Sequence, residues 1–412
     1  MISRIVGGRV VNHGEVVGST LVLDGPRIAG VDSSAGQDAT HKTLLAVATR
    51  SSGGQAAGSA AYDLDAEGCW VVPGFVDLHC HGAVGVDFAT ASAEEMGRAL
   101  AYHLGHGTTT CLPTIASTSL PGYLAQIKSQ PPGEPGALGS SFGGYHLEGP
   151  FLNPEQRGAS SLGSLLLPGE EVVAQLLDAA GGRVRMVTLA PELPGIGDIA
   201  LGLRAAGVVV AAGHTGASRD EALAAARDGL FTHVTHLFNG MPPFHHRQPG
   251  VFGALFACRD LTCDLICDGK HLDPAVVHLV TGSLGFSRVA LITDAVSACG
   301  AGPGEFPLGD SSVTVRVAGE APEIQGRLAG SVLTMDRAVA NAVGMCGVSV
   351  GAASLMASEV PARVAGFDDR GSFDPGMAAD CVLLDQRLSL VAVVRAGQLV
   401  EPSLGQDTPH ET

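Results

Sequence analysis

Hydrophobic positions between residues 71 and 293 fall into short apolar runs separated by longer amphipathic stretches. Runs of this length, bounded by Gly, Pro and polar residues, predict eight buried strands: 71–79, 108–115, 142–148, 184–190, 207–213, 231–236, 261–267 and 288–293. Apolar residues at helical spacing predict helices between most of them, for example 93–104, 169–179, 220–228 and 274–283. We therefore predict an α/β fold, a (β/α)8 TIM-like barrel. The competing doubly wound sheet would place a Gly-rich phosphate loop after its first strand, where this chain has His79-Cys80-His81.

Both ends of the chain show a different pattern, in which short apolar runs alternate with glycine and polar turns. These runs predict β-hairpins and further strands at 2–31, 62–64, 379–384 and 390–394. We expect the two ends to join in one small β-sandwich domain, residues 1–70 plus 372–412, beside a barrel domain of residues 71–371. The small and polar stretch 32–60 predicts a surface excursion, and residues after about 401 predict a loose tail.

Side chains suited to metal binding follow five of the predicted barrel strands. They are His79, His81, Glu148, His214, His236 and Asp294. In a barrel of this kind the C-terminal ends of the strands meet on one face, which is where active sites lie. Imidazole and carboxylate ligands suit zinc and iron, and carboxylates also suit manganese. The pattern therefore predicts a hydrolytic site holding one or two divalent ions, with zinc favoured and iron, manganese or cobalt as the alternatives.

Two ions can be shared among these ligands. His79 and His81 would hold one ion and His214 and His236 the other, with Glu148 bridging them. Asp294 is then the natural general acid and base, because it can take a proton from water and return it to a leaving group. A nearby thiol, Cys80, is expected to point away from its His neighbours by strand alternation and to pack in the core.

Longer motifs around these residues resemble the amidohydrolase superfamily, and within it the N-acetylglucosamine-6-phosphate deacetylase family. The stretches that carry the resemblance include PGFVDLHCHG, YHLEGPFLNPEQRGA, GHTGAS, THLFNGMPPFHHRQPG, DGKHLDP and LITDAVSACG. They run in order through nearly the whole chain. The resemblance implies metal-dependent hydrolysis of the acetamide of a phosphorylated N-acetylamino sugar, in amino-sugar catabolism and recycling. It also implies a primary metal on Glu148, His214 and His236, a second metal on the His79 and His81 pair that some members lack, and catalysis by Asp294.

The same resemblance implies a set of substrate contacts and a homodimer. The contacts are Ala159, Ser160, Asn239, Gly240, Arg247, His271, Leu328, Ala329 and Gly330. Arg247 and His271 match a phosphate clamp, in which the planar guanidinium suits phosphate oxygens. Ser160 stands where the family usually has His, Gly240 replaces an Ala, and Gln248 replaces a Glu. Contacts between subunits are expected around the Pro-rich loop 242–249.

Composition and charge limit the partners. The formal net charge is −17 with no basic run, so we expect neither nucleic acid nor an anionic membrane as a partner, and a phosphosugar would need a local cationic pocket. The apolar runs are too short to span a membrane, and the N-terminus does not resemble a signal peptide. Nine scattered cysteines, among them Cys267, predict ordinary thiols without a disulfide framework. Together these features predict a cytoplasmic protein.

Other substrates and supporting residues stay open at this point. A deacetylase of N-acetylgalactosamine 6-phosphate, another amidohydrolase acting on a cyclic amide or N-acyl amino acid, and a non-catalytic scaffold on the same barrel are alternatives. Asp87 and Asp268 are candidates for orienting histidines, and Glu192 for a structural hydrogen-bonding role. His233 is expected to face the other side of its strand from His236.

Overall fold

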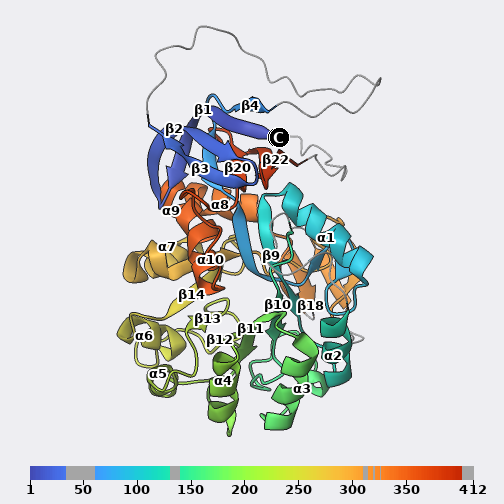
Figure 1. Ribbon diagram of the computed structural model, residues 1–412. Coiled ribbons are helices and arrows are strands. Elements are labelled where there is room, and N and C mark those ends of the chain that lie inside the picture. Colours follow the sequence, from blue (N-terminus) through green and yellow to red (C-terminus); the bar gives the residue numbers. More distant parts are fainter. Residues whose placement is uncertain (34–60, 130–139, 310–313, 319–320, 325, 401–412) are drawn as a thin grey trace.

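The computed structural model describes residues 1–33, 61–129, 140–309, 314–318, 321–324 and 326–400 (Figure 1). Most of the predicted surface excursion, residues 34–60, and the predicted tail, residues 401–412, lie outside the described residues. Within the described part, no helix is both long and apolar enough to cross a membrane.

The centre of the chain forms a parallel barrel of eight strands in sequence order. Its strands are β6 (Phe75–Cys80), β9 (Thr108–Ile115), β10 (Tyr145–Glu148), β11 (Val184–Leu189), β12 (Val209–Ala212), β13 (His233–Val234), β14 (Thr262–Ile266) and β15 (Val289–Ile292). The first and last strands meet where the N–H of Asp294 donates to the carbonyl of His79 at 2.9 Å and Cys80 bridges Ala295 in parallel. The predicted (β/α)8 barrel is therefore confirmed.

Helices follow most of the strands and cover the outside of the barrel (Figure 1). They are α1 (Ala93–Gly105), α2 (Leu120–Lys128), α3 (Glu170–Ala180), α4 (Ile196–Ala205), α5 (Arg219–Arg227), α6 (Gly250–Ala257), α7 (Pro274–Leu284), α8 (Met335–Gly344), α9 (Val350–Ser354) and α10 (Val360–Val364). Two short 3-10 helices, η1 (Leu162–Ser164) and η2 (Phe286–Arg288), accompany them, and the π-helical segment η3 (Leu355–Glu359) joins α9 to α10. In α1, Ser92 and Glu95 form a reciprocal capping box that fixes its start. The residues Met96, Ala99, Leu100 and His103, at spacings of three and four, are buried against the sheet.

The predicted strand 71–79 is wrong as a single element, because the chain changes sheets at Gly74. β5 (Trp70–Pro73) pairs with β1 and β20 in the terminal sheet, whereas β6 belongs to the barrel. The N–H of Gly74 donates to the carbonyl of Asp380 at 2.9 Å. A Cβ at Gly74 would lie 2.3 Å from the Thr109 hydroxyl, so the close approach of the two layers requires glycine there.

Strands from both chain ends form one continuous eight-stranded sheet, drawn at the top of Figure 1. Its members are β1 (Ile2–Asn12), β2 (Glu15–Asp24), β3 (Arg27–Asp32), β4 (Tyr62–Asp65), β5, β20 (Cys381–Leu384), β21 (Leu390–Arg395) and β22 (Gln398–Leu399). At the edge strand β3, Ile28 exchanges backbone hydrogen bonds of 2.8 Å with Gly376 and Met377, so the sheet curls over its own apolar core. The two ends of the chain are thus joined, while the division into domains at 70/71 and 371/372 stays a prediction.

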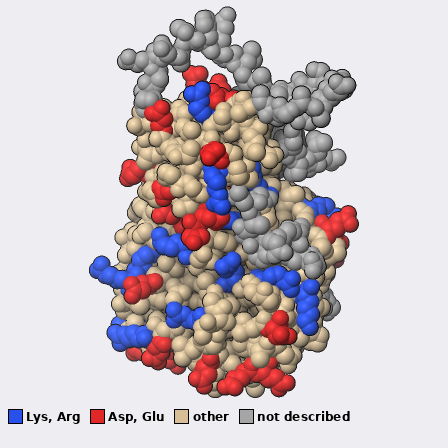
Figure 2. All heavy atoms as spheres, in the orientation of Figure 1, with Lys and Arg blue, Asp and Glu red and all other residues tan. Residues whose placement is uncertain are grey.

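A small sheet that the sequence did not predict follows the last barrel strand. It consists of β16 (Glu305–Pro307), β17 (Thr314–Ala318), β18 (Ala321–Ile324) and β19 (Arg327–Leu328), and a separate hairpin joins β7 (Gly82–Ala83) to β8 (Val86–Asp87). Next to the four-stranded sheet, Val296, Ala298 and Leu308 form a small hydrophobic core. On the face drawn in Figure 2, acidic and basic side chains are interspersed over the described surface.

Candidate metal-dependent active site

All six residues predicted from the strand ends converge on one face of the barrel. His79 and Glu148 lie in the last two residues of β6 and β10, and His81, His214, His236 and Asp294 follow their strands within two residues. All six are buried. Because the C-terminal ends of parallel strands lie on the same face of the barrel, residues that are far apart in the sequence come together here.

The first group consists of Glu148, His214 and His236. The Oε1 atom of Glu148 lies 2.9 Å from Nε2 of each histidine, and the two Nε2 atoms are 3.2 Å apart. Nδ1 of His214 is 2.7 Å from the carbonyl oxygen of Gln156 and donates a hydrogen bond to it, which orients Nε2 toward the carboxylate. Two nitrogens about 2.0 Å from a tetrahedral zinc ion lie about 3.3 Å apart, so the group fits a divalent ion.

The second group consists of His79, His81 and the same Glu148. The Nε2 atoms of the two histidines are 3.0 Å apart, and each lies 3.5 Å from an oxygen of Glu148. Asp294 is close to both, with Oδ1 3.5 Å from Nε2 of His79 and 3.2 Å from Nε2 of His81. The two oxygens of Glu148 therefore reach both histidine pairs, which is the arrangement that a bridging carboxylate requires.

Burial and opposite charges both act on these groups. Burial opposes ionisation of Glu148, but the histidines His214 and His79 outweigh it and hold the pKa of this carboxyl well below its usual range. Burial alone would lower the pKa of His81 and His236, yet their hydrogen bonds to Asp294 and Glu148 raise each to about 9. Without a cation the site therefore keeps protons on these imidazoles, and a metal ion must displace them as it binds.

Three of the site residues adopt left-handed backbone conformations. The φ angles of His214, His236 and Asp294 are 46°, 32° and 49°. Such angles are uncommon for residues with a side chain and persist only where neighbouring groups enforce them. The sharp turn after each strand points these side chains into the common space above the barrel.

One group that enforces this geometry, Asp264, was missed by the sequence reasoning. It is fully buried on β14, accepts the backbone N–H of His236 on Oδ1, and pairs with Nε2 of His233 through Oδ2 at 2.8 Å. His233 also contacts the Thr262 hydroxyl at 2.7 Å. The signal in the sequence is a single charged residue within the apolar run from Leu261 to Cys267.

Glu192 braces the loops around His214, in agreement with its predicted hydrogen-bonding role. Its carboxylate accepts the Thr215 hydroxyl at 2.5 Å, the Gly216 N–H at 2.6 Å and the Asn153 amide at 2.8 Å. The N–H of Asn153 in turn donates to the carbonyl of His214 at 2.9 Å. The carboxylate thus ties the loops that follow β10, β11 and β12.

A cavity opens directly above the two metal-ligand groups. The predicted contact residues that line it, together with His81, Glu148, His214, His236 and Asp294, are Ala159, Ser160, Asn239, Gly240, His271, Leu328, Ala329 and Gly330. His271 is oriented by Asp268, whose Oδ2 lies 2.7 Å from its Nδ1. Asp268 therefore acts on the predicted clamp residue and not on a metal ligand.

Arg247 is not among the residues that line this cavity. It lies in the exposed loop 242–249, with Nη1 3.1 Å from Nε2 of His246. Within the described chain, only the His271 half of the predicted phosphate clamp reaches the cavity. The pairing of Arg247 with His271 stays a prediction.

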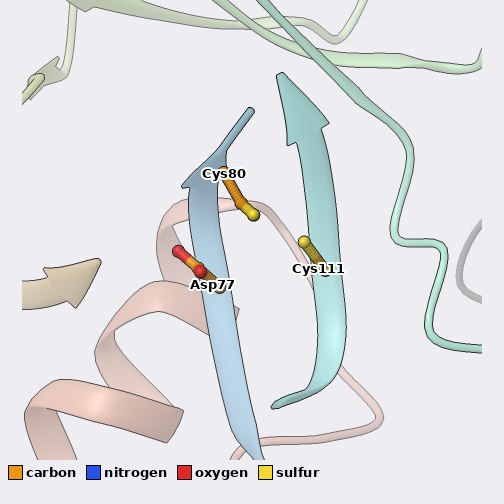
Figure 3. A group of neighbouring side chains, drawn as sticks. All are labelled: Asp77, Cys80 and Cys111. Carbon is orange, nitrogen blue, oxygen red and sulfur yellow. The ribbon is translucent and has the colours of Figure 1, made fainter. Parts of the chain in front are cut away.

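A third group of possible ligands, Asp77, Cys80 and Cys111, lies on β6 and β9 (Figure 3). The two thiols face each other between β6 and β9, while Asp77 points to the opposite side of β6 (Figure 3). The Asp77 carboxylate already accepts the Thr293 hydroxyl at 2.5 Å, and burial raises its pKa to about 7. Cys80 contacts Nε2 of His103 on α1 at 3.1 Å. This group therefore ties strands and helix together instead of offering free ligands.

The barrel and the histidine and carboxylate groups suited to metal binding at its strand ends define the class of metal-dependent barrel hydrolases. The model of the Amidohydrolase family matches residues 70–400, and the chain belongs to this family. The chain is 37% identical over 353 residues to N-acetylglucosamine-6-phosphate deacetylase of Bos taurus, covering 82% of this chain and 84% of the relative. It is 33% identical over 332 residues to N-acetylgalactosamine-6-phosphate deacetylase of Escherichia coli O157:H7, covering 79% and 86%.

A solved structure shows a similar fold with a sugar phosphate bound. It is a mutant of N-acetyl-D-glucosamine-6-phosphate deacetylase from Mycobacterium smegmatis in complex with N-acetyl-D-glucosamine-6-phosphate. The TM-score is 0.82 at 32% identity, covering 96% of this chain and 98% of that chain. The family expected from the sequence motifs is therefore confirmed.

Proposed function

We propose that this protein hydrolyses the acetamide of N-acetylglucosamine 6-phosphate and releases glucosamine 6-phosphate and acetate, in amino-sugar catabolism and recycling. The observation that carries the proposal is the convergence of Glu148, His214, His236 and Asp294 on one cavity, in a chain similar to deacetylases over most of its length. The Mycobacterium smegmatis structure with that same sugar phosphate supports the substrate class.

Glu148, His214 and His236 would hold the primary divalent ion, and His79 and His81 a second one that shares Glu148. Imidazole-rich ligand sets of this kind favour zinc, with iron, manganese or cobalt as alternatives. When bound, such an ion supplies Lewis acidity toward a carbonyl oxygen and makes water acidic enough to lose a proton near neutral pH.

Asp294 is the proposed general base and then the general acid. Its pKa is held low because the charges of His79 and His81 and a hydrogen bond from His81 outweigh the effect of burial. It is therefore ionised at neutral pH and can accept a proton from the attacking water. The same carboxyl then donates that proton to the departing sugar nitrogen, so that the amine leaves as a neutral group.

Binding energy at the other end of the sugar would orient the acetamide. We propose that His271 contacts the phosphate, and that Ser160, Asn239 and Gly240 contact the sugar with Ala159 and the turn Leu328–Gly330. Interactions remote from the reacting bond can align it for attack. Ser160 offers a hydroxyl where an imidazole is expected. Polarisation of the acetyl carbonyl would therefore depend more on the second ion, which His79 and His81 would hold.

We also propose a cytoplasmic homodimer. Arg247 and Phe244 lie on the exposed loop 242–249, and Phe244 is 49% exposed. An exposed aromatic side chain beside a cation is typical of the centre of an interface. Arg247 does not line the cavity of its own chain, so contact between two copies through this loop would place it against the surface of the second copy.

The test is to incubate the metal-loaded protein with N-acetylglucosamine 6-phosphate and to measure free acetate. The galacto epimer and unphosphorylated N-acetylglucosamine serve as comparisons in parallel reactions. We expect the gluco phosphate to have the highest kcat/KM. A higher value for the galacto phosphate would favour the function named for the Escherichia coli relative, and no acetate from either phosphate would refute the proposal.

A further inference from the structure

Two cysteine thiols are in contact beside the segment that carries His271. Cys267 directly follows β14, and Cys346 lies two residues beyond the end of α8. Their Sγ atoms are 3.7 Å apart, and both cysteines are free. Cys267 is 1% exposed and Cys346 is 5% exposed. The proposed deacetylation uses neither of them.

Hydrogen bonds and packing link the Cys267–Cys346 pair to His271, which lines the cavity. Cys267 precedes Asp268, which holds Nδ1 of His271 at 2.7 Å and accepts the His271 N–H at 2.8 Å. On the α8 side, the Asn341 amide donates to the carbonyl of Cys267 at 2.9 Å. A Cβ on Gly269 would lie 3.2 Å from Met345, so this segment also packs against the residue before Cys346. A change in the separation of the two cysteines would therefore move or restrain the segment that orients His271.

We propose that Cys267 and Cys346 form a redox modification site, at which a hydroperoxide oxidises the two thiols to an intrachain disulfide that displaces His271 from its orientation in the cavity. The Cys346 thiolate attacks one peroxide oxygen and becomes a sulfenic acid, with release of water or alcohol from the other oxygen. The Cys267 sulfur then attacks the sulfenic sulfur and expels its oxygen as a second water, with both thiol protons used. Two thiols are oxidised and one peroxide is reduced.

Geometry and chemistry favour this pair. A disulfide needs the sulfurs about 2.0 Å apart, so each side chain has to move by roughly 1 Å from its present contact. Gly347 follows Cys346 with a φ of 69°, in a turn outside α8 that can absorb such a shift. The hydrogen bond from Cys267 lowers the pKa of the Cys346 thiol, which favours the nucleophilic thiolate at the more exposed sulfur. Cys80 and Cys111 also face each other, but both are fully buried beneath α1.

The experiment treats the reduced, metal-loaded protein with hydrogen peroxide and maps the peptides by mass spectrometry without reduction. We expect a cross-linked peptide pair containing Cys267 and Cys346, and two fewer free thiols than the nine cysteines provide. Hydrogen exchange in the peptide spanning 267–271 should change on oxidation in the wild type and not in Cys346→Ser. Cys69→Ser, at a half-buried thiol of the terminal sheet, is the matched control and should respond as the wild type does.

The kinetic effect rests on the proposed function, whereas the peptide map and hydrogen exchange do not. We expect oxidation to raise KM for the phosphosugar several-fold with little change in kcat, because the perturbation acts on binding of the phosphate end. A phosphine reductant should restore KM, and Cys346→Ser should not respond. Absence of the cross-link at a peroxide dose that oxidises Cys69 overturns the proposal, as does a cross-link that leaves both exchange and KM unchanged. If the reduced protein has no deacetylase activity, only the proposed function is refuted. The peptide map and the hydrogen exchange of the 267–271 peptide then test the redox site by themselves.

Discussion

Asp264 offers the sharpest test of how the site is built, because two substitutions there remove different parts of its hydrogen bonding. The carboxylate is fully buried and serves two donors, the backbone N–H of His236 and Nε2 of His233. In Asp264→Asn, the amide oxygen still accepts from His236. The amide nitrogen can then donate to His233, whose tautomer can switch because the Thr262 hydroxyl donates or accepts equally well. The loss is therefore limited to charge assistance, about 1 kcal/mol.

Asp264→Leu keeps the branched shape and the number of side-chain heavy atoms, but it leaves both donors without a partner where water does not reach. An unsatisfied buried group costs about 1–3 kcal/mol, so the two together predict a loss of about 2–6 kcal/mol in the free energy of unfolding. Because His236 is a proposed metal ligand, the dissociation constant of the metal should also rise about 10- to 100-fold in this variant.

The assay is urea unfolding of the metal-free protein followed by circular dichroism, combined with metal competition against a chelator. Asp260→Asn and Asp260→Leu are the matched controls, because Asp260 is exposed just before the same strand. They should change neither measurement appreciably. Equal destabilisation by Asn and Leu at position 264 would refute the reasoning, since it would mean that hydrogen bonding to the two histidines does not determine the effect.

Three further outcomes are expected. Asp294→Asn should lower kcat about 10²- to 10⁴-fold in the acetate assay while metal analysis shows unchanged content, because the amide cannot accept a proton. His81→Ala should remove one equivalent of metal if two ions bind, and unchanged stoichiometry would argue for a single ion. His13, whose pKa is raised by its hydrogen bond to Asp374, should stabilise the fold by less than about 1 kcal/mol. This contribution is complete below the unfolded pKa and is lost as pH rises through the higher folded pKa, so the difference in thermal midpoint between wild type and His13→Gln should shrink from pH about 5.5 to about 8.5.

Much of the barrel could be predicted because its signals are local. The eight apolar runs and the helical spacing of residues such as Met96, Ala99 and Leu100 are set by which side of each element faces the core. The break at Gly74 was not predictable in the same way. The apolar run continues through it, and only the close approach of Thr109 from another strand shows why the chain changes sheets there.

The sequence by itself determined which residues are candidate metal ligands, since His and carboxylates follow apolar strands and parallel strands end on one face. Only the tertiary structure decided how they are shared, with both oxygens of Glu148 reaching two histidine pairs and Asp264 buried beneath His236. It also brought Cys267 to Cys346 and left Arg247 outside the cavity of its own chain. The physical reason is that side-chain identity is local, whereas distances between residues far apart in sequence depend on how strands, helices and loops pack together.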